Sequence, residues 1–257
     1  MFVSRGSCAL DCCVLAIQES LLDLDPDLDS DLDRDLPARF RRGGRGDLGR
    51  AGGPEAGPEV SLRARLGRLG RTVERELLDA GAWVDVRRSW VAGSSGLFAR
   101  LAAEVDWHAQ RRRMYDRIVD VPRLTAFYDV GAELPDPVLG DALDMLGAHY
   151  RAESGGELRT VGLCLYRDGQ DSVAWHGDTI GLGATSDVVV AIVSLGATRR
   201  LLLRPRGGGP SRRFDLASGD LLVMGGSCQR TWEHAIAKTA KPVGARISIQ
   251  LRPAGVR

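Results

Sequence analysis

A histidine and an aspartate stand one residue apart at His176 and Asp178, in the segment VAWHGDTIG, and a further histidine, His234, follows far downstream in TWEHAIAK. Alternate positions of a strand point to one face, so His176 and Asp178 can turn toward the same ion. Two imidazoles and one carboxylate form a facial triad, which leaves open positions on Fe(II) for a co-substrate and O₂. We therefore predict that these three residues bind ferrous iron. Taken alone, the first two are equally well explained by a polar turn at a strand end.

A second group of polar side chains follows in the segment GARISIQLR, where Arg246, Ser248, Gln250 and Arg252 share one face of an alternating strand. Apolar residues form the opposite face, at Ile247, Ile249 and Leu251. Two guanidinium groups on an inward face are costly without an anionic partner. Because guanidinium groups grip carboxylates as bidentate forks, a dicarboxylate such as 2-oxoglutarate would satisfy this face.

The elements that must position these side chains are mostly strands. After Gly156, short runs rich in apolar residues alternate with Gly, Asp and Pro, which is typical of an antiparallel sandwich or barrel. Upstream, apolar spacing predicts helices over 95–110, with Ser94 or Ser95 as N-cap, and over 135–153. The remaining expectations are a short helix or turn over 66–83, a strand over 82–91, and helical positions for His108 and His149 on the surface or in helix packing. The predicted fold class is mainly β with flanking helices (α+β), a double-stranded β-helix or jelly roll with N-terminal helices packed on one face.

Composition divides the 257-residue chain into two parts. Residues 1–60 combine an Asp-Leu run with an Arg/Gly/Pro-rich stretch, which predicts a disordered tail. A nucleic-acid-contacting arm and an over-extended start of translation are the alternatives for this tail. Residues 61–257 are predicted to form a single domain, and the 44% hydrophobic content suffices for a core.

Charge and cysteine usage narrow the class of protein. The formal net charge of +1 does not indicate a strongly basic nucleic-acid binder. The five cysteines form no C-x-x-C pair, which excludes a disulfide framework and a zinc site and favours the cytoplasm. No run is apolar for long enough to span a membrane, and no signal peptide is evident.

From about Pro122 to Arg252 the chain resembles the AlkB-like Fe(II)/2-oxoglutarate-dependent dioxygenases, closest to the subgroup that repairs alkylated DNA and RNA. The blocks that carry the resemblance occur in family order: PRLTAFY, LYRDGQDSVAWHGD, VSLGATRRLLLR, SGDLLVMGG, TWEHAIAK and R-x-S-x-Q-x-R. The resemblance implies that Arg246 pairs with the distal carboxylate of 2-oxoglutarate, that Tyr166 assists, and that Arg252 lies near the metal. It implies no catalytic residue beyond the metal site.

The chain departs from the family pattern at several positions. Cys164 and Ser248 stand where the family usually has Asn, and Gln250 stands where it usually has Thr. After Asp178 the family often continues with acidic residues, one of which reads the damaged base, whereas this chain has Thr179 and Ile180. The substrate can therefore differ from that of the usual repair enzymes.

The implied activity is oxidative dealkylation of alkylated DNA or RNA bases with Fe(II), 2-oxoglutarate and O₂, releasing succinate, CO₂ and an aldehyde. A hydroxylase or demethylase acting on tRNA, protein or a small molecule, and a non-catalytic nucleic-acid-binding relative, are the alternatives. Protein partners stay undetermined.

Phe127 and Tyr128 either stack on a base or belong to the core. The other substrate-side candidates are Trp175, which also fits a packing role, Thr179, and, for the nucleic-acid backbone, Arg206, Arg212 and Arg213 beside a glycine-rich hairpin tip.

Overall fold

The computed structural model describes residues 63–114 and 117–256 of the chain. The tail expected at 1–60 lies outside the described residues, as do Cys8, Cys12 and Cys13. Among the described residues, none of the helices is both long enough and apolar enough to cross a membrane.

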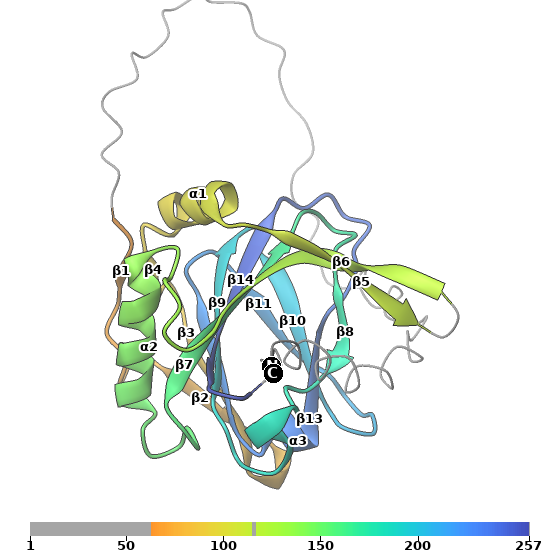
Figure 1. The fold of residues 1–257 in the computed structure, drawn as a ribbon. Helices are drawn as coiled ribbons and strands as arrows, with labels where there is room; N and C mark the ends of the chain where they lie inside the picture. Colours follow the sequence, from red (N-terminus) through yellow and green to blue (C-terminus); the bar gives the residue numbers. More distant parts are fainter. Residues whose placement is uncertain (1–62, 115–116, 257) are drawn as a thin grey trace, which may run out of the picture. The chain divides into compact units, whose positions relative to one another are not determined.

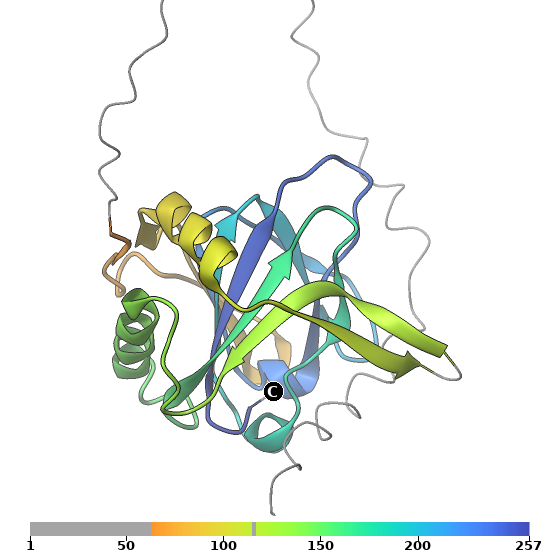
Figure 2. The same cartoon turned by 45° about the horizontal axis from the view of Figure 1, so that its top comes forward.

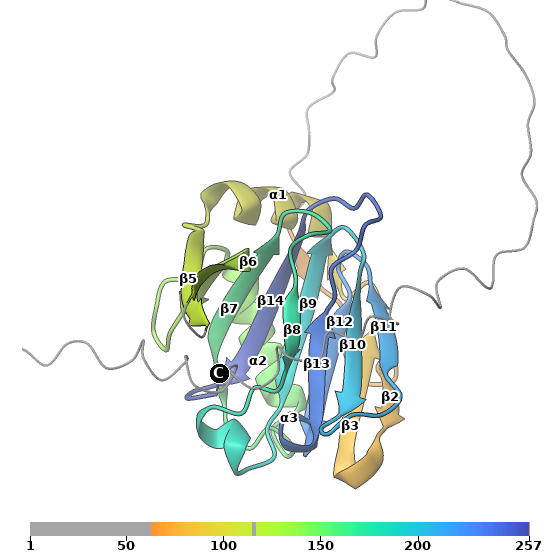
Figure 3. The ribbon, with the colours of Figure 1, turned by 90° about the vertical axis from the view of Figure 1, so that its right-hand side faces the viewer.

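Two antiparallel sheets dominate the structure, with eight and four strands in the described part (Figure 1). The large sheet has the spatial order β2-β3-β12-β9-β14-β7-β6-β5. Its strands are Glu74–Leu77 (β2), Ala82–Arg87 (β3), Leu221–Gly226 (β12), Val190–Gly196 (β9), Arg246–Pro253 (β14), Leu158–Tyr166 (β7), Arg117–Tyr128 (β6) and His108–Met114 (β5). The small sheet comprises Arg212–Leu216 (β11), Arg199–Pro205 (β10), Trp232–Ile236 (β13) and Val173–His176 (β8), which lie side by side in Figure 3. A separate short pairing joins Arg65–Leu66 (β1) to Val91–Ala92 (β4).

The order of strands in the two sheets identifies the fold. From β7 onward the chain crosses repeatedly between the sheets, with β7, β9, β12 and β14 in the large sheet and β8, the β10–β11 hairpin and β13 in the small one. Strands β9 and β14 are neighbours although β10 to β13 lie between them in sequence. This winding of one chain through two facing sheets is a double-stranded β-helix, which confirms the predicted jelly roll.

Two helices pack against the large sheet. Helix α1 (Ser94–Glu104) contacts β9, and α2 (Pro137–His149) contacts β7 (Figures 1 and 2). A third, short helix, α3 (Cys228–Thr231), connects β12 to β13. The Asp136 side chain caps α2 by accepting from the Val138 N–H at 3.0 Å, and Pro137 occupies the first turn, where it needs no N–H partner.

Alternation along the strands builds one core on each face of the large sheet. Leu163 and Ile249 face the helices and pack in one cluster with Leu97 of α1 and Leu146 of α2. Apolar residues on the other side fill the space between the sheets, including Ile192, Leu201, Leu203, Phe214 and Ile236. The polar side chains of β7 and β14 therefore enter the space between the sheets.

Tertiary pairing overrode local pattern in the segment before β3. The expected short helix or turn over 66–83 contains instead strand β2 and a single 3-10 turn at Asp79–Gly81. Arg75 of β2 forms a bidentate pair with Asp85 of β3, at 2.7 and 2.8 Å, and also binds Glu153. Pairing with a neighbouring strand thus decided the conformation of a segment with ordinary helix formers.

Two further local expectations were wrong. The N-cap residue of helix α1 is Gly93, which has a positive φ of 73°, and no serine side chain caps the helix. The Ser94 hydroxyl instead accepts a hydrogen bond from the Ser218 hydroxyl at 3.0 Å. His108 lies on strand β5, because the predicted helix ends at Glu104 and the chain then pairs with β6. His149 does end a helix, as expected.

Candidate active site

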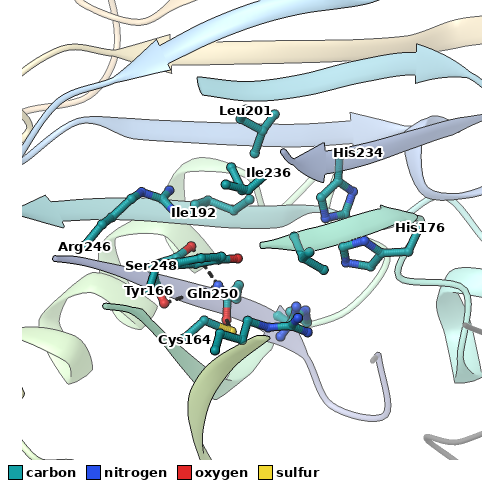
Figure 4. Close-up of a pocket in the computed structure, with 13 residues that line it drawn as sticks. Cys164, Tyr166, His176, Ile192, Leu201, His234, Ile236, Arg246, Ser248 and Gln250 are labelled. Carbon is teal, nitrogen blue, oxygen red and sulfur yellow. Dashed lines mark hydrogen bonds between the residues drawn. The ribbon is translucent and has the colours of Figure 1, made fainter. Parts of the chain in front are cut away.

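A pocket lies between the two sheets, and both sheets contribute side chains to it (Figure 4). Figure 4 shows two imidazole rings at one end and the guanidinium of Arg246 at the other. The lining residues are Arg123, Cys164, Tyr166, Val173, His176, Ile192, Leu201, His234, Ile236, Arg246, Ser248, Gln250 and Arg252. All the co-substrate candidates from the sequence and both candidate histidines therefore surround one cavity.

His176 and His234 are brought together by strand pairing. His176 ends β8, and His234 lies directly opposite it on β13. Their ring centroids are 4.2 Å apart with the rings tilted by 46°. The His176 Nδ1 lies 2.8 Å from the carbonyl oxygen of Ala174, and since a carbonyl only accepts, Nδ1 donates. In the neutral ring this leaves the lone pair on Nε2, the atom available to a metal.

Burial keeps both imidazoles neutral. It lowers the pKa of His234 to about 3, and the neighbouring His176 adds to the effect. Burial also lowers the pKa of His176, although Asp178 opposes that shift. Neutral imidazole is the form that binds metals, so both rings have a free lone pair at neutral pH.

Asp178 is buried and ionised. Burial opposes its ionisation, but the charge and the hydrogen bonds of Arg252 outweigh burial, and the pKa of Asp178 is lowered to about 2. Its carboxylate pairs with the Nε and Nη2 of Arg252 at 3.2 and 3.3 Å. Its backbone N–H donates to the side-chain oxygen of Gln229 at 3.0 Å.

The donor chemistry of these three residues fits Fe(II), which takes two imidazoles and a carboxylate in a facial triad. Their geometry is less complete: within residues 63–114 and 117–256, no three His, Cys, Asp or Glu side chains are arranged closely enough to hold a metal ion. The Asp178 carboxylate is engaged by Arg252. A metal ion held by the two imidazoles would therefore compete with Arg252 for the Asp178 carboxylate.

The opposite end of the pocket is cationic. Arg246 is only 1% exposed, and its Nε donates to the Ser194 hydroxyl at 2.9 Å. Both its Nη atoms are buried and have no hydrogen-bond partner. Burial lowers the pKa of Arg246, and the ring of Tyr166 lies 5.3 Å from its guanidinium carbon. A buried guanidinium with two unused donors is built for an anionic ligand.

The residues that depart from the family pattern form a network of their own on the pocket wall. Gln250 donates through Nε2 to the Ser248 hydroxyl at 2.7 Å. Its Oε1 accepts from the Cys164 thiol at 3.7 Å. The three substitutions thus satisfy one another, and they leave Arg246 outside their hydrogen bonds.

Three residues near the pocket were not predicted from sequence. Arg123 lines it, donates through Nη1 to the Ser172 carbonyl at 3.2 Å, and has an unpartnered, buried Nε. Strand alternation in PRLTAFY offered a signal, because Arg123 shares a strand face with Thr125 and Phe127. Ser194 and Gln229 carried no such signal, since their partners lie 52 and 51 positions away in sequence.

The aromatic candidates lie on different faces. Phe127 pairs with Gly162, whose missing side chain would touch Arg252 and Gln250, so Phe127 shares the face of the pocket. Tyr128 packs instead against the core under the helices. Trp175 is outside the pocket: it clusters with Leu202 and Ala235, beneath Arg204 at 4.2 Å. The structure thus removes Tyr128 and Trp175 from the pocket and leaves Phe127 beside it.

The basic candidates belong to the β10–β11 hairpin, whose tip at 207–209 consists of three glycines with positive φ. Arg206 lies 3.6 Å from Glu233 and donates to the Arg230 carbonyl at 3.1 Å. Its Nη2 also lies 3.0 Å from where a side chain on Gly177 would begin. Arg212 pairs with Glu76 at 3.4 Å, and Arg213 is exposed. Thr179, next to Asp178, donates its N–H to the Gly177 carbonyl at 2.8 Å.

Comparison with known proteins adds independent evidence. The family model described as the 2OG-Fe(II) oxygenase superfamily matches residues 141–252. Alpha-ketoglutarate-dependent dioxygenase alkB homolog 3 of Bos taurus is 29% identical over 179 residues, which cover 62% of this chain and 61% of that protein. The chain thus spans about three fifths of the length of that relative.

Two other relatives match shorter parts of the chain. DNA oxidative demethylase ALKBH2 of Arabidopsis thaliana is 30% identical over 133 residues, 42% of each chain. Uncharacterized protein R406 of Acanthamoeba polyphaga mimivirus is 34% identical over 134 residues, which cover 49% of this chain and 69% of that protein. With its jelly roll, its pocket and these matches, the chain belongs to the 2OG-Fe(II) oxygenase superfamily as an AlkB-like member.

Proposed function

We propose that this chain is an Fe(II)- and 2-oxoglutarate-dependent dioxygenase that oxidatively dealkylates nucleic-acid bases. The observation that carries the proposal is the buried guanidinium of Arg246, with two unpartnered Nη atoms, in the same pocket as His176 and His234. This combination offers a metal end and a carboxylate end in one cavity. Iron, 2-oxoglutarate and O₂ together supply the hydroxylation of an N-alkyl carbon, with release of succinate, CO₂ and an aldehyde.

The side chains of the chain have distinct roles in this proposal. His176, His234 and Asp178 hold the iron. Arg246 grips the distal carboxylate of 2-oxoglutarate as a bidentate fork, and Ser194 fixes its guanidinium plane through Nε. Arg252, now paired with Asp178, neutralises negative charge at the metal end. Ile192, Leu201 and Ile236 give the pocket an apolar wall, which helps to exclude water from the reacting groups.

A nucleic-acid substrate is supported by relatives and by charge. One similar protein is named a DNA oxidative demethylase. The β10–β11 hairpin carries Arg206, Arg212 and Arg213, and Arg206 reaches the turn that holds Asp178. Exposed arginines on such a hairpin can contact phosphates while a base enters the pocket. Phe127, 42% exposed on the pocket face, offers a surface for stacking. Free thiols at Cys164 and Cys228 support the cytoplasm as its location.

A second candidate function is hydroxylation or demethylation of another substrate, such as a modified tRNA, a protein or a small molecule. The specific observation in its favour is the sequence after Asp178, where Thr179 and Ile180 supply no carboxylate to read a base. In addition, Arg123 places an unpartnered buried donor on the pocket wall. A cation at this position favours an acceptor group on the substrate, such as a carbonyl oxygen.

The test is a screen of purified protein with Fe(II), 2-oxoglutarate and oligonucleotides that carry defined N-alkylated bases. Oligonucleotide mass and succinate are measured together, with the His176→Ala variant and unmodified oligonucleotides as controls. Loss of the alkyl group, dependent on His176, is the expected result. Succinate that no alkylated oligonucleotide stimulates supports the second candidate. If the protein binds the metal but forms neither succinate nor a dealkylated oligonucleotide, the result supports a non-catalytic nucleic-acid-binding relative.

A further inference from the structure

We propose that Gln229 is a positioning residue for the iron site: its side chain holds the Asp178 turn in place from helix α3. The inference rests on the proposed function, because it concerns the carboxylate that would bind the metal. Gln229 is not part of the pocket lining and would not touch the metal or the substrate. It acts through the backbone of Asp178.

The contact is direct and buried. Gln229 is 2% exposed, and its Oε1 accepts the Asp178 N–H at 3.0 Å. Asp178 lies two residues beyond the end of β8, past the last strand pair that the described residues make there. A buried N–H that lost its acceptor would carry a desolvation penalty, so this hydrogen bond resists displacement of the turn.

The backbone of α3 is fitted to the same turn. A side chain on Gly177 would begin 2.5 Å from the Gln229 carbonyl oxygen and 3.3 Å from the Trp232 carbonyl oxygen. Only a residue without a Cβ lets the two backbones approach so closely. Helix α3 leads directly into β13, which carries His234. The helix therefore joins the turn that carries Asp178 to the strand that carries the second histidine.

This junction matters because the Asp178 carboxylate has a competing partner. Arg252 holds it at 3.2 and 3.3 Å, and a metal ion held by the two histidines would compete with Arg252 for it. With the backbone fixed by Gln229, the carboxylate would stay within reach of that ion. Without the anchor, the turn would be free to follow Arg252. Loss of such supporting hydrogen bonds weakens metal affinity by about 10–100-fold in other metal sites.

Substitutions at Gln229 can test the amide oxygen and the amide nitrogen independently. Its Nε2 is buried and has no hydrogen-bond partner, so only the oxygen is used. Gln229→Met preserves the length and removes the acceptor. Gln229→Glu preserves an acceptor oxygen and removes the unused nitrogen. Tyr150→Phe is a matched control, because it deletes one buried hydrogen bond, 2.9 Å long, to Asp85 in the core under the helices.

The experiment is an anaerobic Co(II) titration of the full chain, followed by the visible absorption bands of the bound ion. Gln229→Met should weaken Co(II) binding by about 10–100-fold and alter the bands. Gln229→Glu should recover most of that affinity, and Tyr150→Phe should bind like the unaltered chain. Equal affinity in the Met variant, or an equal loss in Tyr150→Phe, overturns the proposal. An unaltered chain that binds no Co(II) refutes the proposed function instead.

A second measurement does not depend on the variants folding. In the unaltered protein, hydrogen exchange at the Asp178 amide should be strongly slowed, because a buried side chain accepts from it. Exchange at this amide as fast as in an exposed loop contradicts the proposal. Slow exchange at this amide in the unaltered protein supports it.

Discussion

At the scale of single residues, the pocket is defined by donors that the folded chain does not use. Arg246 donates through Nε to the Ser194 hydroxyl, and both its Nη atoms are buried without a hydrogen-bond partner. Leaving buried charged donors without partners is costly, and proteins retain such groups where a ligand completes them. Arg199 shows the contrast: its Nη atoms donate to the carbonyls of Asp168, Asp171 and Ala237, and it is a structural residue.

Arg246→Lys should weaken 2-oxoglutarate binding while keeping the positive charge. A lysine cannot present two parallel donors, so one charge-assisted hydrogen bond, about 1.5–3 kcal/mol, is lost. The expected fall in affinity is roughly 10- to 150-fold. Calorimetric titration with Mn(II) present measures it. Arg200→Lys, which alters an equally bidentate pair with Asp215, is the control and should leave the affinity unchanged. Unchanged binding in Arg246→Lys would remove Arg246 from the carboxylate site.

Gly177→Ala should destabilise the turn between His176 and Asp178. The added methyl group would meet the Gln229 carbonyl oxygen at 2.5 Å, and backbone cannot move aside as a flexible side chain can. Overpacking of this kind costs about 1–3 kcal/mol. Gly147→Ala is the matched control, because nothing lies within 4 Å of the new atom in α2. It should raise stability by about 0.5–1 kcal/mol. Urea unfolding measures the free energy of unfolding of both variants. Equal stability of the two variants would contradict the predicted steric clash.

At the scale of elements, the arginines of the β10–β11 hairpin fall into two groups. Some are held in ion pairs within the protein, and others are exposed and can contact a ligand. Arg200 and Asp215 pair across the hairpin, and Arg206 is held by Glu233 and the Arg230 carbonyl. Arg213 lies on the exposed side of β11, and Arg212 makes one half-exposed contact with Glu76. Exposed ion pairs contribute little to stability, so Arg212 and Arg213 can be altered without unfolding the hairpin.

The double change Arg212→Glu and Arg213→Glu should weaken binding to a single-stranded oligonucleotide and flatten its salt dependence. Each phosphate contact contributes about 0.7 to the slope of log affinity against log salt for single strands. Fluorescence anisotropy at several salt concentrations gives the slope. Arg151→Glu, an exposed position two residues beyond the end of α2, is the control. A slope that stays the same in the hairpin variant would mean that these arginines form only a solvated face.

At the scale of the whole molecule, ligand binding and folding are linked. The pocket lies between the two sheets, so a dicarboxylate bound there would contact β14 and, through the proposed metal end, β8 and β13. A ligand that binds only the folded state stabilises it by mass action. The two sheets are otherwise joined across the pocket by the apolar residues between them.

Mn(II) with 2-oxoglutarate should therefore raise the melting temperature of the chain. At a ligand concentration of 100 times Kd, the stabilisation is about 2.7 kcal/mol. Differential scanning fluorimetry detects a shift of this size. Acetate at the same concentration is the control, because a monocarboxylate cannot bridge Arg246 and the metal end. The same shift with acetate would argue against a site for a dicarboxylate.

Chain truncation tests which residues make the folding unit. A chain shortened to residues 61–257 should fold cooperatively, because the described core residues all lie within it. A chain that begins at Gly93 should not, since it lacks β3 and the fully buried Val84 and Trp90. Circular dichroism and thermal melting measure both. Aggregation of the 61–257 chain would show that the first sixty residues belong to the folding unit.

The local sequence pattern was enough to predict which side chains share a face of a strand or helix. Alternation placed Arg246, Ser248, Gln250 and Arg252 on one side of a strand, and the pocket lining contains all four. Helical spacing predicted α1 and α2, and the spacing of short apolar runs predicted the jelly roll. These features repeat within a few residues, so a short window contains the information.

Only the tertiary structure decided which faces meet. Register between β8 and β13 sets His176 opposite His234, and the packing of α3 brings Gln229 to Asp178. The fold also pairs the Asp178 carboxylate with Arg252 of β14, whereas alternation along β8 already places Trp175 on the face opposite His176. Such contacts join positions far apart in the chain, and their register is set by the fit of the whole core, so no local stretch of sequence encodes them.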